Sequence, residues 1–382
     1  MTTLWDTTGT AVVKALAAER RTGGAVMSGL ALTLVVVVDE KDVAEAEAAA
    51  TTAASRHPCR TLVVIRRHVD APVPRLDAEV LIGGRLGPGE SVVMRMQGRL
   101  ALHAESVTLP LLAPDAPVVT WWHGEPPDLI AHDPLGVFAE RRVTDVSRAT
   151  DPLQALRQRA RDFAPGDTDL AWTRTTAWRA LLASAFDTVR AAPVRAVVHG
   201  QETDPEALLF AGWLTSRLGF PVPVESPNGQ RGRGGVLGVA VDLDDGGSLN
   251  ATGAAGREVL LRRVGQPDST VALPERELGD LLAEELRRLD ADQPYADALG
   301  AATGTPGLSA RSSHRVHIWR DPAEASAGEA RPGEQTDGGP YSAPDSGGSG
   351  ADAAGGTAGG SPDGGQADCG PAGSGGDGGR AG

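Results

Sequence analysis

The sequence predicts an α/β fold with two domains, each built on a mixed sheet, and a disordered C-terminal tail. The run at residues 30–38 is apolar and β-branched on both faces, which is typical of an interior strand covered by helices. Helix-like and strand-like segments alternate over the first 320 of the 382 residues. Residues 321–382 contain no Val, Ile, Leu, Met, Phe or Trp, so they lack the side chains that build a core.

The first elements predict a βαβ unit. An amphipathic helix is expected at residues 10–20, strands at 30–38 and 60–67, and an alanine-rich helix between them at 42–56. The two strands should be parallel neighbours or near neighbours. Asp39 ends the first strand, where α/β proteins often place ligands. Capping the helix that starts near residue 42 accounts for Asp39 at least as well.

The rest of the first domain, assigned to residues 1–150, has shorter elements. Residues 78–82 and 91–96 predict an antiparallel hairpin, residues 100–109 a helix and residues 118–122 a strand. Trp121 and Trp122 are adjacent on that last strand, so one ring should face the core and the other outward. The outward ring is either a binding anchor or is covered by the second domain.

The second domain is assigned to residues 151–320. Helices are expected at residues 151–163, 170–189, 205–218, 275–289 and 294–302. Strands are expected at residues 194–199, 222–224, 236–243, 257–264, 269–273 and, as an edge strand, 315–319.

Composition limits the function classes. The net charge is −14, of which −8 belongs to residues 321–382, so the body is only mildly acidic and a nucleic-acid binder is not expected. No apolar run reaches the roughly 20 residues of a membrane span, and residues 1–21 do not resemble a signal peptide, so we expect a cytoplasmic protein away from membranes. Cys59 and Cys369 predict neither a metal site nor a redox pair.

Catalytic motifs are not recognisable in the body of the chain. Lys14 and Lys41 do not follow glycine, which excludes a Walker loop, and neither a Gly-x-Ser-x-Gly elbow nor a His-Glu-x-x-His helix occurs. Arg231 and Arg233 lie in a glycine cluster that predicts a flexible loop, with an anion contact as the alternative. We therefore predict no catalytic residue, no metal and no cofactor.

Residues 166–179 concentrate acids, arginines and tryptophans in a chain with few aromatic residues. On one continuous helix capped by Asp167 or Thr168, Trp172 and Arg179 share a stripe that can project at another surface, and Trp178 falls on the apolar face. Trp178 is then a core residue. The projecting face either recognises a ligand or partner, or fixes the two domains through ion pairs.

Several ordered blocks of this sequence resemble the OpcA family of glucose-6-phosphate dehydrogenase assembly and activator proteins, of the actinobacterial type. The blocks are residues 57–65 (HPCRTLVVI), 109–122 (LPLLAPDAPVVTWW), 133–136 (DPLG), 141–145 (RRVTD) and 166–179 (GDTDLAWTRTTAWR). The resemblance covers residues 4 to about 319. It does not extend into residues 321–382.

The resemblance implies a non-catalytic protein that binds glucose-6-phosphate dehydrogenase and promotes its assembly or activity in the oxidative pentose phosphate pathway. The thioredoxin-linked redox control of cyanobacterial relatives is not expected here, because the two cysteines are not suitably placed. An α/β module that binds a sugar phosphate or nucleotide, a degraded enzyme, and a structural subunit are the alternatives. The candidate partner- or ligand-binding residues are Trp121, Trp122, Arg141, Arg142, Asp145, Asp167, Asp169, Trp172, Arg174 and Arg179.

Overall fold

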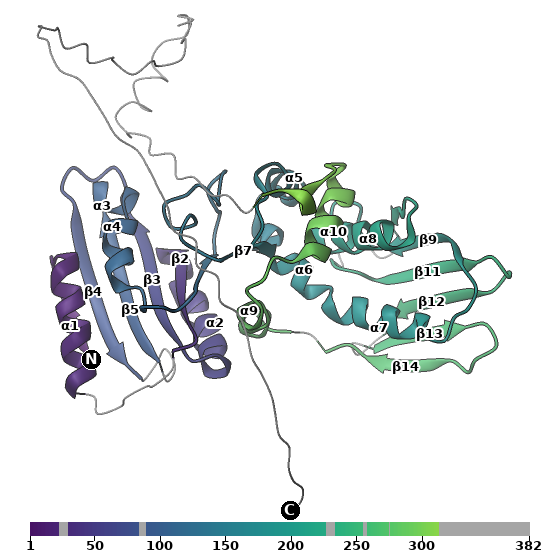
Figure 1. The fold of residues 1–382 in the computed structure, drawn as a ribbon, viewed down its shortest axis with the longest axis horizontal. Coiled ribbons are helices and arrows are strands. Elements are labelled where there is room, and N and C mark those ends of the chain that lie inside the picture. Colours follow the sequence, from purple (N-terminus) through teal and green to yellow (C-terminus); the bar gives the residue numbers. More distant parts are fainter. Residues whose placement is uncertain (23–29, 84–88, 227–233, 255–257, 275, 313–382) are drawn as a thin grey trace, which may run out of the picture. The chain divides into compact units, whose positions relative to one another are not determined.

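The computed structural model describes residues 1–22, 30–83, 89–226, 234–254, 258–274 and 276–312. These residues form helices and two mixed β-sheets, so the predicted α/β class is confirmed (Figure 1). The tail predicted at 321–382, the edge strand predicted at 315–319, and the loop with Arg231 and Arg233 lie outside the described residues.

The first sheet has eight strands in the order β1-β4-β5-β3-β2-β6-β7-β8. The six strands from β5 to β8 in this order run parallel, and β4 pairs antiparallel with both β1 and β5. The bounds are β1 Thr2–Leu4, β2 Leu32–Asp39, β3 Cys59–Arg67, β4 Arg75–Ile82, β5 Glu90–Gln97, β6 Val118–Trp122, β7 Arg141–Thr144 and β8 Asp167–Asp169.

Both faces of the first sheet are covered. Helix α2 (Val43–Arg56) and helix α9 (Leu278–Arg287) pack on one face, and α1 (Gly9–Thr22) packs on the other, together with the short helices α3 (Arg99–Leu102) and α4 (Glu105–Thr108). Alternate residues of β2 therefore enter different cores, and seven of its eight residues are buried. The predicted βαβ unit is confirmed, since β2 and β3 are parallel neighbours around α2.

The second sheet has six strands in the order β10-β9-β11-β12-β13-β14. Only β10 and β9 are parallel, and the other neighbours are antiparallel. Helices α7 (Thr176–Phe186) and α8 (Pro205–Leu218) share a core with it. The strand bounds are β9 Pro193–His199, β10 Val224–Glu225, β11 Gly238–Leu243, β12 Ser248–Gly253, β13 Glu258–Arg263 and β14 Ser269–Ala272.

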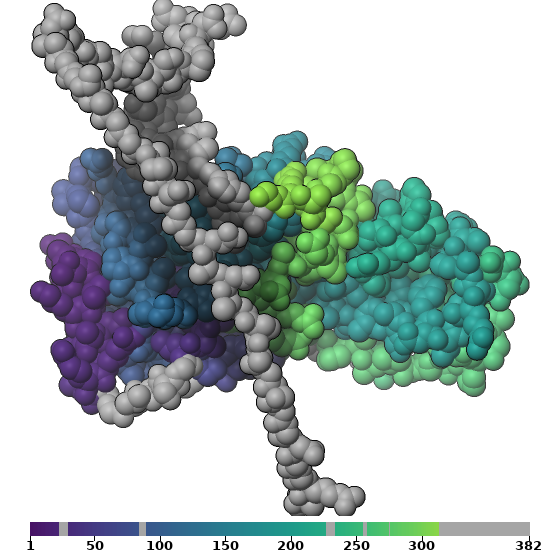
Figure 2. Space-filling model, in the orientation of Figure 1, coloured from purple at the N-terminus to yellow at the C-terminus, as the bar shows by residue number. Residues whose placement is uncertain are grey.

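Helices α9 and α10 (Gln293–Thr303) lie between the strands of the two sheets (Figure 1), and green atoms of the C-terminal part of the described chain fill the middle of the space-filling view (Figure 2). Helix α9 packs closely against α2, and α10 packs closely against α8. A Cβ on Gly279 of α9 would lie 2.5 Å from Thr52 Cβ of α2, and a Cβ on Gly212 of α8 would lie 2.2 Å from the carbonyl oxygen of Ala298 of α10. Glycine is needed at both positions, because only the absence of a side chain lets the helices approach this closely.

Several predicted elements need correction. The helix expected at residues 100–109 is the two short helices α3 and α4, and β1, β7, β8 and β12 were not predicted. The helix expected at 170–189 is broken at Thr175 into α6 (Leu170–Arg174) and α7, since the Thr175 backbone nitrogen donates three residues back to the carbonyl of Trp172 and its ψ is −5°. β8 belongs to the first sheet although it follows residue 150. The domain boundaries at residues 150 and 320 remain a prediction.

Within the described ranges, no helix is long and apolar enough to cross a membrane.

Candidate functional site

Most of the predicted recognition residues converge at the junction of β7, β8 and α6. The short strands bring them together because β7 pairs in parallel with both β6 and β8. Apart from Arg174, which is partly exposed, each is at most 5% exposed. The residues at this junction are Arg141, Arg142, Asp145, Asp167, Asp169, Trp172 and Arg174.

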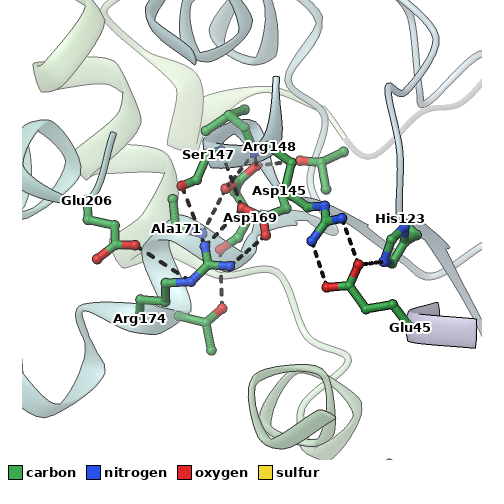
Figure 3. Close-up of polar contacts among 12 residues, drawn as sticks. Glu45, His123, Asp145, Ser147, Arg148, Asp169, Ala171, Arg174 and Glu206 are labelled. Carbon is green, nitrogen blue, oxygen red and sulfur yellow. Dashed lines mark hydrogen bonds and ion pairs between the residues drawn. The ribbon is translucent and has the colours of Figure 1, made fainter. Parts of the chain in front are cut away.

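Asp169 ends β8 and has no exposed surface. Its carboxylate accepts hydrogen bonds from Thr144 Oγ1 at 2.6 Å and from the backbone nitrogens of Val146 and Ala171 at 3.1 and 2.9 Å (Figure 3). Burial, with the nearby Asp145 carboxylate, raises the pKa of Asp169 to about 6. Because it accepts from Ala171, Asp169 is the N-cap of α6, and it also fixes the turn after β7.

Asp145 forms a two-bonded ion pair with Arg174. Arg174 Nη1 and Nη2 donate to the two Asp145 oxygens at 2.9 and 2.6 Å, the strong parallel geometry of guanidinium with carboxylate (Figure 3). Arg174 Nε also lies 3.6 Å from Glu206 Oε1 at the start of α8. Burial raises the pKa of Glu206 to about 7. The pair therefore ties the end of β7 to α6 and α8.

Two further buried ion pairs start from β7. Arg142 Nε donates to Asp167 Oδ1, and its Nη1 and Nη2 donate to the carbonyls of Ala139 and Pro165 at 3.0 and 2.8 Å. Arg141 Nε donates to Glu285 of α9 at 2.9 Å, across 144 residues of sequence. Both arginines are thus committed to partners inside the chain.

Trp172 is buried inside the chain, so of the two roles expected for its stripe, recognition at an exposed surface is contradicted for this ring, and a contact between the two domains stays a prediction. It is 1% exposed, and its Nε1 donates to Asp292 Oδ2 at 2.9 Å. The guanidinium carbon of Arg179 lies 3.5 Å above the centre of its ring. Trp178, expected in the core, is only partly buried at the edge of the second core. The break at Thr175 turns α7 relative to α6, so stripes drawn on one continuous helix misplace both rings.

Trp121 and Trp122 face opposite sides of the first sheet, as their adjacency predicted. Both are covered: Trp121 is 0% exposed and packs in the core shared with α2 and α9, and Trp122 is 1% exposed on the other face. Trp121 is therefore the ring covered from the C-terminal half of the chain. Neither ring is available as a surface anchor.

A second cluster, which the sequence did not predict, joins α2 to the turn after β7. Arg148 Nη1 and Nη2 donate to the two Glu45 oxygens, each at 2.9 Å (Figure 3). His123 Nε2 lies 3.2 Å from Glu45 Oε2, although its N–H is not directed for a hydrogen bond. Burial, with the charge of Arg148, lowers the pKa of His123. These residues come from three separate segments, and no local pattern marks them.

A cleft opens at the carboxyl ends of β2, β6 and β7. It consists of a larger cavity of about 550 Å³, which reaches Asp145, Arg148 and the start of α5 (Pro152–Asp162), and a smaller, adjoining cavity of about 220 Å³ beside Trp122. The two share Asp39 and the segment 124–126. Asp39 makes no capping hydrogen bond, so of its two predicted roles the structure favours the position at a ligand cleft.

The cleft lies at a topological switch point: the chain continues from β2 to β3 on one side of β2, and β6, on the other side, follows only after β5. The turn after β2 carries Asp39, Glu40 and Asp42, where a bound pyrophosphate would need glycine and backbone N–H donors. The described residues contain no group of three or more His, Cys, Asp or Glu able to hold a metal. Burial raises the pKa of the Cys59 thiol to about 11, which makes it unreactive.

Fold and site define an α/β protein with two sheets, in which buried ion pairs hold the charged end of the first sheet. The chain belongs to the OpcA family. Residues 50–161 match the family's glucose-6-phosphate dehydrogenase subunit N-terminal domain, and residues 165–299 match its C-terminal domain.

Known proteins give one sequence relative and several weak structural likenesses. An OpcA protein of the OxPP cycle from Synechococcus elongatus is 31% identical over 201 residues, which is 49% of this chain and 40% of that relative. A 3-ketoreductase from Actinomadura kijaniata (TM-score 0.36, 12% identity, 72% of this chain and 96% of that one) and an NAD-binding oxidoreductase from Klebsiella pneumoniae (0.38, 11%, 77% and 100%) are similar at a low level. These values are too low to indicate a shared function.

Proposed function

We propose that the chain is a non-catalytic protein that binds glucose-6-phosphate dehydrogenase in the cytoplasm and promotes its assembly or activity in the oxidative pentose phosphate pathway. Both matched family domains are described as parts of a subunit of this dehydrogenase. The similar Synechococcus protein is assigned to the OxPP cycle. The partner and the pathway of this chain are inferred from those descriptions.

The observation that carries the non-catalytic role is the sealing of the charged centre. Asp169 has the shifted pKa of many catalytic acids, yet it is 0% exposed and both oxygens accept hydrogen bonds inside the chain. Arg141 and Arg142 are 3% and 0% exposed and are bound by carboxylates and carbonyls. A general acid or base must reach the proton that it transfers, which these groups cannot do.

The buried candidate residues therefore support a partner surface from inside and do not form it. Trp5, beside the first sheet, is a better direct contact because 70% of it is exposed. Its position is fixed, since β1 pairs with β4 and the backbone nitrogens of Asp6 and Thr7 donate to Asp77 Oδ1 and the carbonyl of Leu76, each at 2.8 Å. Tryptophan is one of the side chains enriched among the residues that contribute most to binding at protein interfaces.

The proposal is tested with purified dehydrogenase from the same organism. We expect the chain to co-elute with it and to change its initial rate in a saturable way, while the chain alone oxidises no glucose 6-phosphate. Trp5→Ala should weaken binding and so raise the half-saturating concentration of the chain by about thirtyfold. Val264→Ala, at an equally exposed apolar side chain of the second sheet, is the matched control. The proposal would be overturned if the chain neither co-elutes with the dehydrogenase nor changes its initial rate.

A further inference from the structure

The second sheet is wider than the helices that cover it. Neighbouring strands lie about 4.8 Å apart and a helix is about 10 Å across, so one helix covers roughly two strands. Of the described helices, α7 and α8 share a core with this six-stranded sheet. The buried residues of that core come from β9, β11, β12 and β13, and none of those described comes from β14 at the edge of the sheet (Figure 1). A strip along β13 and β14 therefore stays open beside α7.

A groove of about 510 Å³ lies along this strip. Leu261 of β13, Val271 of β14 and the following Leu273 line one side, and α7 lines the other from Ala177 to Ala185, which is about two helical turns. Val271 and Leu273 are only partly buried. An apolar groove beside a helix, one helix wide, fits the apolar face of a second, amphipathic helix.

The groove carries one positive charge. Among the described residues that line it, Arg263 alone is charged. Its Nη1 donates to the hydroxyl of Thr188 at 3.3 Å, and it forms no ion pair with a described residue. The next residue, Arg262, lies on the other face of β13 and pairs with Asp268. A carboxylate brought to Arg263 would make a charge-assisted hydrogen bond, so the complementary helix is acidic where it meets this end of the groove.

A second copy of this chain has no suitable helix among its described residues. Helices α1, α2, α5, α8, α9 and α10 each bury their apolar side chains in one of the cores. A helix that enters the groove with a free apolar face must come from another protein.

We propose that this groove binds an amphipathic helix of glucose-6-phosphate dehydrogenase, with its apolar face on Leu261 and Val271 and a carboxylate on Arg263. The identity of the partner rests on the function proposed above. The groove is a contact separate from Trp5, which lies beside the first sheet. Val264, the control residue for Trp5, does not line the groove.

Filling the groove tests the proposal. Binding of the full chain to purified dehydrogenase is measured by titration calorimetry. Ala180 is exposed on α7 and lines the groove, whereas Ala183, also exposed on α7, does not line it. Glutamine suits a helix, so both Ala180→Gln and Ala183→Gln should keep the fold and its melting temperature. We expect Ala180→Gln to raise the Kd by about tenfold or more and Ala183→Gln by less than about twofold.

The charge is tested separately. Arg263→Gln should raise the Kd by about fivefold and make binding less sensitive to salt, because the ion pair with the dehydrogenase is lost. Arg263→Lys keeps the charge and should restore most of the affinity and of the salt dependence. Arg262→Gln is the matched control on the other face of β13 and should leave both unchanged. An equal loss in Arg262→Gln would show that no carboxylate is bound at Arg263.

The outcomes separate this inference from the proposed function. Equal affinity of Ala180→Gln and the unaltered chain overturns the groove and leaves the proposed function intact, whereas a chain that does not bind the dehydrogenase overturns both. Hydrogen exchange should show one amphipathic helix of the dehydrogenase protected in the complex, and protection of an extended segment alone would contradict the proposal. Self-association of the chain that Ala180→Gln abolishes, measured by sedimentation, would assign the groove to a second copy and overturn the proposal as well.

Discussion

The two sheets of this chain are stabilised differently. In the first sheet, β2 and β3 are buried on both faces, and the interior contains buried ion pairs, such as Arg141 with Glu285 at 4% and 5% exposure. In the second sheet, burial alternates along β13, and the pair Arg262 with Asp268 is 60% and 56% exposed. The first region should therefore be sensitive to single substitutions, and the outer face of the second should tolerate them.

The largest effect is expected from Trp121→Ala in the first sheet. Emptying this fully buried site should lower the free energy of unfolding by about 3 to 5 kcal/mol, through lost burial and the cavity left against α2 and α9. Asn250→Ala, on the outer side of the second sheet, should stay within about 0.5 kcal/mol. Urea denaturation of both variants measures the two losses in free energy of unfolding. Similar losses would contradict the difference expected between the two sheets.

Breaking a buried ion pair should come next. Glu285→Gln leaves the Arg141 charge buried and should cost about 3 kcal/mol, whereas Asp268→Asn at the exposed pair should cost less than about 1 kcal/mol. The double variant Arg141→Met with Glu285→Leu should recover much of the loss, because it removes both charges. A double variant as unstable as Glu285→Gln would show that the pair is needed for more than charge balance.

A smaller effect is expected from Trp172→Phe. Phenylalanine keeps most of the ring but loses the bond from Nε1 to Asp292 and weakens the stacking with Arg179, so the loss should be about 1 to 2 kcal/mol. Trp178→Phe, at the partly buried ring, should change stability less. Thermal melting compares the stability losses of the two variants. A larger loss for Trp178→Phe would show that Trp178, and not Trp172, is the more important core residue.

The smallest effect is a pH dependence. Burial raises the pKa of Asp162 from its ordinary 3.8 to about 7. The folded chain then holds a proton that the unfolded chain has released, so stability falls as pH rises through 7. From pH 6.5 to 8 the Asp162 contribution should be on the order of 1 kcal/mol, and Asp162→Asn should remove it.

The lower limit of that range is set by His123, whose lowered pKa acts in the opposite direction below its ordinary value of 6.5. Asp268→Asn, at an exposed side chain, is the control and should leave the pH dependence unchanged. Glu206, whose pKa is also raised to about 7, adds a slope of the same sign that Asp162→Asn leaves in place, so the prediction fails if Asp162→Asn has the same slope as the unaltered chain.

The sequence predicted those parts whose signals are local. The apolar run ending at Asp39 and the alanine-rich helix after it gave β2, α2 and their parallel partner β3. β7 was missed because two of its four residues are arginines, and their partners Asp167 and Glu285 lie 25 and 144 residues away. Trp172 was misplaced because the helix was taken as continuous, whereas the backbone hydrogen bond from Thr175 to Trp172 ends α6 after one turn. Ion pairs between residues far apart in the chain produce no repeating pattern in the sequence, so sequence analysis cannot predict them.

Helix α9 has a consequence for how this chain is made. Its leucines 281, 282 and 286 complete the core on one face of the first sheet, and Glu285 neutralises Arg141. A ribosome releases β2 and β3 more than 200 residues before α9, so that face stays exposed during most of synthesis. Apolar surface held open for so long invites aggregation. Final closure must wait for a contact of large sequence separation, which slows folding.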